Sequence, residues 1–549
     1  MPVHAYSAAA IRAAEQPHLD AGRGEALMRS AAAGLATACR RALTDSRGRV
    51  TGARVAVLAG PGSNGGDALF AAANLAHRGA HVTVIAPLGR LHAAGRQAAR
   101  RAGVVFREPA EAADSDDSGA GSAAAAEDTG TALAEDAALA ADAALAADAD
   151  LVIDGLLGTG ARPRLEPPLS TLIHAWQTAA RRRSPHRSGA AQLVVAVDVP
   201  TGVDATTGEC GQIHVRADLT VTFGGRKAGL HLPGGAEAGG RIEFVDIGLD
   251  LEDSDAPVRI VDDADLRDWP RPGPRDHKYT RGVLGVVAGS QQYPGAGVLT
   301  SLAAVHAGVG MLRVQGAGTV QDAVVARAPE AVTAPGRVQA WTMGSGAPEP
   351  HDMMEFLSEA IGTSTPLVLD AGALSLLPAL LRVAAAPLPA CTVLTPHAGE
   401  LTHLLTRIDE EAPGLERGDV ESDPVRWARR AAGLTGAIVL LKGRRTLLAA
   451  PDGRLWAPTP GPAGLATAGS GDVLAGLVGA ALATGLRPER TADPAGSAAA
   501  LAARAVMLHN RAGRFARSAS GIIEAIAPEL AALAPRDPVR KGTGDTHAP

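Results

Sequence analysis

Short aliphatic segments alternate with alanine-rich stretches along most of the chain. Each aliphatic segment has the length of a strand and ends at Gly, Pro or Asp, whereas the alanine-rich stretches favour helices. This alternation predicts open parallel sheets, in which ligands bind at the carboxyl ends of the strands. The aliphatic segments of the first half are RVAVLAG (54–60), HVTVIAP (81–87), LVIDGLLG (151–158), LVVAVDVP (193–200) and ADLTVTFGG (217–225).

A second series of aliphatic segments predicts a second sheet. We therefore expect an α/β protein with two domains, at 1–250 and 275–534. The segments of the second series are GVLGVVAGS (282–290), MLRVQG (311–316), AWTMGSG (340–346), LVLDAGAL (367–374), TVLTPHAGE (392–400) and AIVLLKG (437–443).

Three stretches interrupt this pattern. Residues 111–150 are almost all Ala, Asp, Glu, Ser and Gly, without the large apolar side chains of a core, which predicts a mobile insertion. Residues 251–274 are rich in Asp and Pro and predict a linker between the domains. The polar residues 535–549 predict a disordered tail.

The composition narrows the class of protein. Aromatic residues make up 3% of the 549 residues and hydrophobic residues 46%, so the cores must consist of Ala, Val and Leu. A net charge of -6 does not indicate the basic surface that binds nucleic acid. The three cysteines are too far apart for a metal site or a disulfide framework, and we expect reduced thiols in a cytoplasmic protein. We expect no signal peptide and no membrane span, and the sequence leaves open whether the chain forms a homo-oligomer.

Three strand ends in the first half carry candidate chemistry. The first strand runs into PGSNGGDALF, where backbone N–H groups at a helix N-terminus would bind an anion such as phosphate. Asp154 ends the third strand and is followed by GTGARP. Asp198 follows a buried strand directly and is a candidate general acid or base. On these residues alone, a tight turn with Asn64 and Asp67 as caps, and a helix-capping role for Asp198, remain open.

Together, NGGD (64–67), VIDGLLGTG (152–160), VDVPTGVD (197–204) and VTFGGRKAGL (221–230) resemble the NAD(P)H-hydrate epimerase family. The resemblance covers about residues 1–250 and implies a Rossmann-like three-layer domain that binds the hydrated cofactor and a potassium ion. It implies Asp198 as the catalytic residue. The implied substrate contacts are Ser63, Asn64, Gly65, Gly66, Asp67, Gly158, Thr159, Gly160, Ala161, Arg162, Pro163, Arg164 and Asp198. The implied potassium ligands are Asn64, Asp154 and Thr201.

This half departs from the family at two positions in the turn. Ser63 stands where the family usually has Asn, and Ala68 where it usually has Gly. Neither is the implied catalytic residue, so we expect altered affinity rather than a dead site. A first domain that only anchors or regulates the second remains an alternative.

The sharpest motif of the second half is ATAGSGDVLAGLVGAALATG (466–485). Its glycines and the following helix form an anion site at a helix N-terminus, with Asp472 in the first turn. Glycines for helix packing with Asp472 as a cap are the alternative. Gly-x-Gly-Asp at the start of a helix is similar to the ribokinase-like fold, in which this Asp acts on the hydroxyl that receives phosphate.

With WTMGSG (341–346), LVLDAGAL, TPHAGE (395–400) and LLKGRRT (440–446), this half resembles the ADP-dependent NAD(P)H-hydrate dehydratases over about residues 275–530. Fusion to the epimerase is a known arrangement in this family. The resemblance implies that Asp472 is the catalytic base and contacts the substrate. The other implied contacts with the hydrated cofactor are Ala296, Gly346 and His397. The implied nucleotide contacts are Lys442, Gly443, Arg444, Arg445, Thr446 and Gly471.

The implied reaction activates a poor leaving group. Transfer of the ADP β-phosphoryl group to the ring hydroxyl, with magnesium, makes phosphate the leaving group, and AMP and phosphate are the co-products. The implied substrates are hydrated NADH and NADPH together with ADP. The main alternative is a kinase of the same fold, for example one that acts on a hydroxymethylpyrimidine, and His397 could simply cap the next helix.

Overall fold

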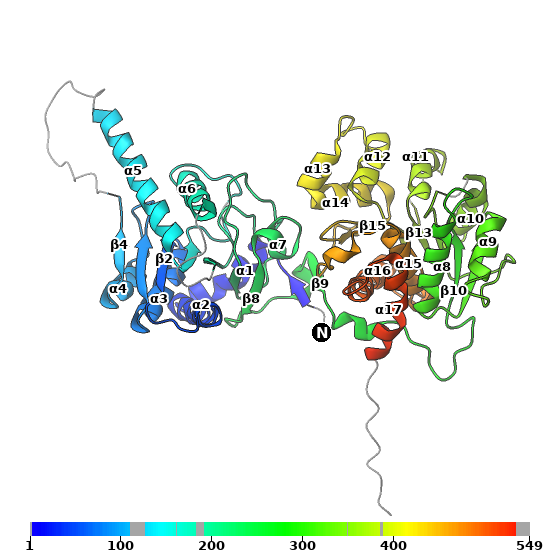
Figure 1. Cartoon of the computed structure of the whole chain (residues 1–549), viewed down its shortest axis with the longest axis horizontal. Helices are drawn as coiled ribbons and strands as arrows, with labels where there is room; N and C mark the ends of the chain where they lie inside the picture. Colours follow the sequence, from blue (N-terminus) through cyan, green and yellow to red (C-terminus); the bar gives the residue numbers. More distant parts are fainter. Residues whose placement is uncertain are drawn as a thin grey trace, which may run out of the picture. The chain divides into compact units, whose positions relative to one another are not determined.

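A computed structural model describes residues 3–109, 127–160, 162–182, 191–347, 350–384 and 388–533. The chain divides into two compact units, one of His4–Val258 and one of Met1–Val3 with Arg259–Pro549. Each unit contains its own sheet (Figure 1). The tail predicted at 535–549 lies outside the described residues.

The first unit contains a seven-stranded, all-parallel sheet in the order β4-β3-β2-β5-β6-β7-β8. The strand order reverses direction between β2 and β5, the type of position at which open sheets bind ligands. The strands are β2 (Arg54–Ala59), β3 (His81–Ile85), β4 (Val105–Arg107), β5 (Leu151–Gly155), β6 (Leu193–Val197), β7 (Leu219–Phe223) and β8 (Arg241–Val245).

Helices cover both faces of this sheet and bury two separate apolar clusters. One cluster joins α2, α3 and α4 to one face of the sheet, and the other joins α5 and α6 to the opposite face. This arrangement confirms the Rossmann-like three-layer prediction. The helices of the unit are α1 (Ala8–Asp20), α2 (Gly24–Arg47), α3 (Ser63–His77), α4 (Ala93–Arg101), α5 (Glu127–Asp148), α6 (Leu169–Arg182) and α7 (Gly235–Ala238), with short 3-10 turns η1 (Ala228–His231) and η2 (Asp253–Asp255).

The other sheet has ten strands in the order β1-β9-β17-β16-β15-β14-β13-β12-β10-β11, and all of it belongs to the second unit except His4 and Ala5 of β1 and Val258 of β9. Its strands from β15 to β11 are parallel, whereas β16 and β17 extend the sheet in antiparallel pairs. The strands are β1 (Val3–Ala5), β9 (Val258–Val261), β10 (Val283–Val287), β11 (Met311–Gln315), β12 (Ala340–Met343), β13 (Leu367–Leu369), β14 (Thr392–Leu394), β15 (Ile438–Leu441), β16 (Leu447–Ala449) and β17 (Leu455–Pro458).

Helix α15 is the central helix of this unit, and its residues from Val473 to Ala483 are all buried. Its glycines allow neighbours to approach closely, since a Cβ at Gly476 would lie 2.2 Å from the carbonyl oxygen of Thr300 on α8. The helices are η3 (Asp265–Asp268), α8 (Pro294–His306), α9 (Gly318–Val325), α10 (Pro350–Gly362), α11 (Gly372–Ala384), α12 (Ala398–Ile408), α13 (Arg417–Ser422), α14 (Pro424–Thr435), η4 (Ala463–Leu465), α15 (Ser470–Gly485), η5 (Pro488–Arg490), α16 (Pro494–Ala512) and α17 (Ala519–Ala532).

Two stretches differ from the sequence-based prediction. The stretch 127–148 of the predicted mobile insertion forms helix α5, and its Ala143, Ala146 and Ala147 are buried against the sheet. Leu139 and Leu145 of the same helix are partly buried against this cluster, so the segment carries an apolar face with which to pack. The predicted linker 251–274 contains strand β9, and its Trp269 is buried in the core of the second unit.

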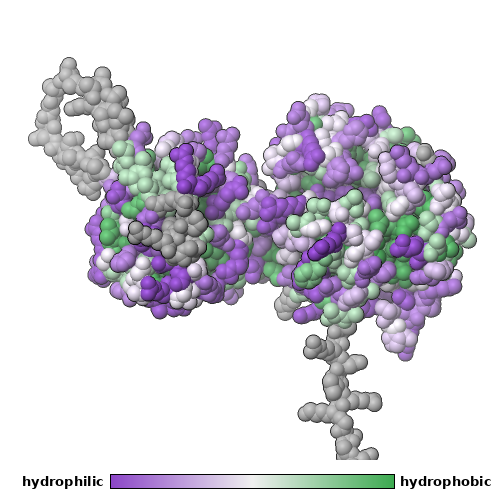
Figure 2. All heavy atoms as spheres, viewed as in Figure 1, coloured by the Kyte–Doolittle hydropathy of each residue, from purple (hydrophilic) through white to green (hydrophobic). Residues whose placement is uncertain are grey.

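None of the described helices is long and apolar enough to cross a membrane. Figure 2 shows hydrophilic residues over both units on the visible face, with smaller hydrophobic areas between them.

Candidate active sites

In the first unit, a tight turn joins β2 to α3 at the reversal point of the sheet. A Cβ at Gly60 would lie 1.8 Å from the carbonyl oxygen of Leu156, and one at Gly65 would lie 1.9 Å from that of Gly60. Only glycine fits these two positions without moving backbone. The turn thereby places the buried residues Asn64 to Asp67 in the first turn of α3, where the backbone N–H groups that precede Gly66 have no helical partner; the Gly66 amide itself donates to the Gly62 carbonyl oxygen at 3.1 Å.

Asn64 connects this helix N-terminus to the two neighbouring strands. Its side-chain amide donates to the carbonyl oxygens of Leu157, at 3.1 Å, and Val197, at 2.6 Å. A Cβ at Gly158 would lie 2.9 Å from the Asn64 Oδ1 atom. The structure therefore brings together the predicted residues that follow β2, β5 and β6.

Asp154 and Thr201 form a second buried group at the same edge. The Thr201 hydroxyl and backbone amide donate to the two Asp154 carboxylate oxygens, at 2.7 and 2.8 Å. Asp154 has no exposed surface, and burial raises its pKa to about 6, although bonds from Thr201 and Leu156 oppose the shift. Among the described residues, the donors to the Asp154 carboxylate are the hydroxyl and amide of Thr201 and the amide of Leu156, and all three are uncharged.

Asp198 lies directly after β6 and is held by a buried lysine. Its Oδ1 atom accepts bonds from Lys227 Nζ, from the Thr222 hydroxyl at 3.0 Å and from the Phe223 amide at 3.1 Å. Its φ of 67° is left-handed, a conformation that non-glycine residues adopt rarely and often at functional sites.

Lys227 was not predicted as a site residue, although it lies in the quoted motif VTFGGRKAGL. It is 1% exposed, and its ammonium group also donates to the Phe223 carbonyl oxygen at 2.7 Å. Asp198, the candidate general acid or base, is thus one partner of a buried ion pair. A lysine 29 residues away can be assigned to Asp198 only once the strands are placed.

Asp67 supplies a second carboxyl group to this site. Its Oδ1 atom is buried and has no hydrogen-bond partner among the described residues. Burial, and then the charge of Asp198, raise the pKa of Asp67 well above its ordinary value, while Lys227 opposes the shift. The site therefore contains a carboxyl group with a raised pKa beside a carboxylate that is paired with an ammonium group.

The remaining predicted contacts of the first unit lie on a more exposed loop. The Thr159 carbonyl oxygen accepts a bond from Arg12 at 3.4 Å, and the exposed Arg164 pairs with Glu166 at 3.0 Å. Ala161 lies outside the described residues. The other predicted contacts in this group are Ser63, at the start of α3, and Gly160, Arg162 and Pro163, on the loop after β5.

In the second unit, helix α15 begins at the glycine turn that the sequence predicted. Gly469 has a left-handed φ of 83°, and the buried Ser470 hydroxyl lies 3.1 Å from His509 Nε2 on α16. Gly471 and Asp472 follow in the first turn. Burial lowers the pKa of His509 to about 4, so the imidazole is neutral and fixes the first turn without adding charge.

Lys442 and Asp370 form an ion pair in front of this helix. Lys442 Nζ lies 2.8 Å from Asp370 Oδ1 and 3.7 Å from Glu400 Oε2, and a Cβ at Gly471 would lie 3.7 Å from Lys442 Nζ. Burial alone would lower the pKa of Lys442, but Asp370 and Glu400 outweigh burial and raise it.

Asp370 was not predicted as a site residue. It follows β13 directly, is 2% exposed, and accepts bonds from the Ser345 hydroxyl at 2.9 Å and the Thr395 hydroxyl at 2.8 Å. The carboxyl ends of β12, β13, β14 and β15 meet at Asp370. Its position after a strand is the same signal that singled out Asp198.

Asp472 stands beside this ion pair with a raised pKa of about 6. Burial is the largest cause, the charge of Asp370 adds to it, and Lys442 opposes it. A carboxyl group with a pKa of about 6 is ionised at neutral pH and is a stronger base than an ordinary aspartate.

The other predicted residues of this unit surround the same edge. A Cβ at Gly346 would lie 2.5 Å from the Cβ of Ala296, so these two residues are in contact. His397 caps α12, since its Nδ1 atom accepts the Glu400 amide at 3.1 Å, and pairs through β-bridge contacts with Lys442. The predicted nucleotide loop, which comprises Gly443, Arg444, Arg445 and Thr446 after Lys442, connects β15 to β16.

The oxygen-rich groups described above are not conventional transition-metal sites. Within the described ranges, no three His, Cys, Asp or Glu residues are grouped so that they could hold a metal ion. A magnesium ion, which keeps several waters and binds through substrate phosphates, needs no such cluster.

Comparisons with known proteins agree with this division of the chain. A family model described as YjeF-related protein N-terminus matches residues 24–229, and one described as NAD(P)H-hydrate dehydratase matches residues 284–536. The chain is also similar to solved structures, among them an ADP/ATP-dependent NAD(P)H-hydrate dehydratase from Bacillus subtilis, at 24% identity and a TM-score of 0.40, with 49% of this chain and 96% of that chain covered. A TM-score of that size carries no weight here.

Full-length relatives decide the family. A bifunctional NAD(P)H-hydrate repair enzyme from Mycobacterium tuberculosis is 40% identical over 506 residues, which are 90% of this chain and 91% of the relative. Its counterpart from Mycobacterium leprae is 39% identical over 540 residues, which are 96% and 100% of the two chains. Both units, with both strand-end sites, are included in these matches, and the chain belongs to the family of bifunctional NAD(P)H-hydrate repair enzymes.

Proposed function

We propose that the chain restores hydrated NADH and NADPH in two reactions. The first unit interconverts the R and S forms of the hydrated ring, and the second dehydrates the S form with ADP, giving AMP and phosphate. The observation that carries this proposal is the pair of separate sites. Each combines a glycine-lined helix N-terminus with a carboxylate at the carboxyl edge of a parallel sheet.

In the epimerase site, the carboxyl groups move the proton of the departing and returning hydroxyl. The ring nitrogen lone pair expels the hydroxyl from the neighbouring carbon and leaves an iminium. Asp67, whose pKa burial raises well above its ordinary value, donates a proton to that hydroxyl, and Asp198 accepts one when water adds to either face. Lys227 keeps the Asp198 carboxylate in place. The helix N-terminus at Ser63 to Gly66 binds the phosphates of the substrate.

A potassium ion fits the group of Asn64, Asp154 and Thr201. A fully buried carboxylate whose described partners are all uncharged leaves one negative charge without an opposite charge. Burying an unpaired charge is unfavourable, and a monovalent cation would balance it. The three side chains offer the hard oxygen atoms that an alkali ion binds. The bound ion would hold the ends of β5 and β6 and the start of α3 in one geometry.

In the dehydratase site, Asp472 accepts the proton of the ring hydroxyl as that oxygen attacks the β-phosphorus of ADP. The α15 N-terminus stabilises the negative charge on the transferred group. A magnesium ion bound together with the nucleotide would neutralise part of the charge on its phosphate groups. Phosphate then leaves with help from the ring nitrogen, and the neighbouring ring carbon loses a proton to complete the dihydropyridine.

Separate substitutions test the two halves of this proposal. Asp198→Ala should abolish R-to-S conversion while ADP-dependent dehydration of the S form continues, because the two sites lie in different units. Asp472→Ala should have the opposite effect. Recovery of dihydronicotinamide absorbance follows dehydration, and chromatography follows the R and S forms.

The alternative kinase is tested in the same experiment. Wild-type protein that leaves hydrated NADH unchanged with ADP and magnesium, yet transfers phosphate to a pyrimidine alcohol, would establish the kinase instead. If Asp198→Ala converts the R form to the S form as fast as the wild type, Asp198 is not the catalytic residue of the first unit.

A further inference from the structure

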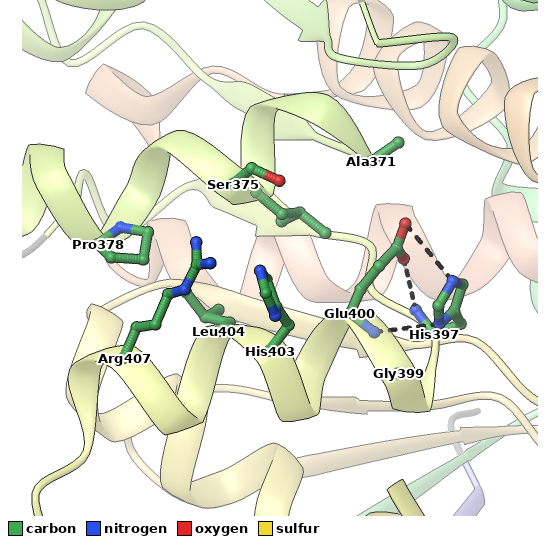
Figure 3. Close-up of a pocket in the computed structure, with 10 residues that line it drawn as sticks. Ala371, Ser375, Pro378, His397, Gly399, Glu400, His403, Leu404 and Arg407 are labelled. Atoms are coloured by element: carbon green, nitrogen blue, oxygen red, sulfur yellow. Dashed lines mark hydrogen bonds and ion pairs between the residues drawn. The ribbon is translucent and has the colours of Figure 1, made fainter. Parts of the chain in front are cut away.

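A cavity of about 270 Å³ lies between α11 and α12, next to the dehydratase site. Figure 3 shows Ser375 and Pro378 from α11 facing a row of side chains on α12. Its volume is just below the range for complete small-molecule sites, so it suits one portion of a larger ligand. The other lining residues are Ala371, Leu374, His397, Gly399, Glu400, His403, Leu404 and Arg407.

One end of this cavity belongs to the dehydratase site. His397 and Glu400 line it, and Glu400 lies 3.7 Å from Lys442 Nζ beside Asp370. Glu400 also accepts the His397 amide at 2.9 Å, so its carboxylate is already bonded. A ligand bound at the catalytic groups can therefore continue directly into this cavity.

The other end of the cavity is basic and has no opposite charge. Arg407 and His403 are exposed, and their side chains form no hydrogen bond or ion pair with any residue that the structure describes. Both point from α12 into the space below α11 (Figure 3). Glu400 is the one carboxylate among the lining residues and is bonded elsewhere, so the Arg407 end favours an anion.

The length of α12 identifies which part of the substrate reaches Arg407. His397 and Arg407 are ten positions apart, which is about 15 Å along a helix at 1.5 Å per residue. A reacting ring at Asp472 and His397 cannot also contact Arg407. The hydrated dinucleotide, however, has a second phosphate and an adenosine beyond its nicotinamide half.

We propose that this cavity is the subsite for the adenosine half of the hydrated dinucleotide, with Arg407 and His403 binding its phosphate groups. The proposal rests on the dehydratase function proposed above. Leu374, Pro378 and Leu404 supply apolar surface for the ribose and base, while Arg407 supplies the charge-assisted bonds that hold phosphate.

Kinetics of the full-length protein with two substrates tests the subsite. Arg407→Ala should raise the KM for S-NADPH hydrate about tenfold and leave kcat nearly unchanged, because Arg407 does not contact the reacting ring. The same variant should show wild-type KM and kcat for the hydrated reduced nicotinamide mononucleotide, which lacks the adenosine half. Arg407→Lys should retain part of the affinity, because it keeps the charge and loses the planar fork.

Arg417→Ala is the matched control. Arg417 is also an exposed arginine on a helix, it pairs with Glu421 at 2.8 Å, and it does not line the cavity. Its substitution should leave both KM values unchanged.

The outcomes separate this inference from the function on which it rests. Wild-type protein without dehydratase activity would refute the function itself. An active wild type with an unchanged KM in Arg407→Ala would refute the subsite alone. An equal loss with the mononucleotide, or a raised KM for ADP instead, would also refute it, since the cavity would then serve the nicotinamide half or the co-substrate.

Discussion

Replacing Lys227 by Met tests the buried ion pair of the first unit. Lys227 is 1% exposed and bonds to both Asp198 and the Phe223 carbonyl oxygen. Methionine has a similar length and no charge. In Lys227→Met, the Asp198 carboxylate would therefore remain buried with only the Thr222 hydroxyl and the Phe223 amide as donors.

The expected cost follows from the burial of both partners. Removing one partner of a buried ion pair costs about 3–5 kcal/mol, because the other charge is left without compensation. A domain of this size loses about 2–4 °C in Tm for each kcal/mol, so the transition of the first unit should fall by roughly 6–20 °C. The second unit does not contain this pair, and its transition should not move.

Calorimetry and two activity assays measure the result. Epimerisation should fall by about a hundredfold or more, the scale of general acid–base catalysis, while dehydration of the S form serves as the internal control. The double variant Asp198→Asn/Lys227→Met removes both charges and should recover much of the lost stability without recovering epimerisation. A Lys227→Met protein with wild-type Tm and wild-type epimerisation would refute the assigned role of the pair.

Two further predictions concern the potassium group and the buried histidine. The Tm of the first unit should be higher in potassium salt than in sodium salt. Thr201→Val should remove this difference in Tm, because it deletes the hydroxyl that donates to Asp154. An equal Tm in both salts for the wild type would count against the ion. His509 has a folded-state pKa of about 4, below its unfolded value of about 6.5, so its contribution to stability is present above pH 6.5 and is lost as pH falls towards 4. Urea unfolding at pH 7 and pH 5 should show less loss of stability in His509→Gln than in the wild type, by about 2 kcal/mol, and equal losses would contradict this.

The sequence predicted the chemistry at strand ends better than the pairing between strands. Asp154, Asp198 and Asp472 could be located because each carboxylate follows a strand or opens a helix, a position that is visible in the order of residues. Lys227 could not be located in this way, because its contact with Asp198 depends on β6 and β7 lying side by side. Asp370 had a visible signal, since it follows the aliphatic part of the segment LVLDAGAL, but the resemblance carried no role onto this residue.

The alanine-rich segment shows a different limit of pattern reasoning. Large apolar residues are the usual mark of a buried helix, and α5 has few of them. Its fully buried residues include Ala143, Ala146 and Ala147, with Leu139 and Leu145 partly buried beside them. The side chain of Gln192 donates to the carbonyl oxygens of Ala146 and Ala147 at 2.8 and 3.2 Å. Small side chains let a helix lie close to its neighbours, so it can be buried with few large residues. The composition of a segment alone does not show whether this happens.

Each site contains a buried lysine that pairs with an aspartate, but only in the first unit is that aspartate the proposed catalytic one. This difference predicts how the pKa of Asp472 responds to substitution. In the first unit, the buried lysine pairs with the proposed catalytic residue Asp198 itself. In the second unit, Lys442 pairs with Asp370, and Asp370 adds to the raised pKa of Asp472. Asp370 thus keeps the lysine away from the base and also repels its ionised form.

Asp370→Asn should therefore lower the pKa of Asp472, because it removes a like charge and leaves Lys442 free to pair with the base. In the wild type, kcat/KM for dehydration should rise with pH through about 6, as Asp472 loses its proton. In Asp370→Asn, this rise should move to lower pH, and the plateau should fall because a weaker base accepts the proton less readily. Asn keeps the acceptor for the Thr395 hydroxyl, so a lower plateau with the rise still at about pH 6 would show that Asp370 acts on the structure of the site and not on the basicity of Asp472.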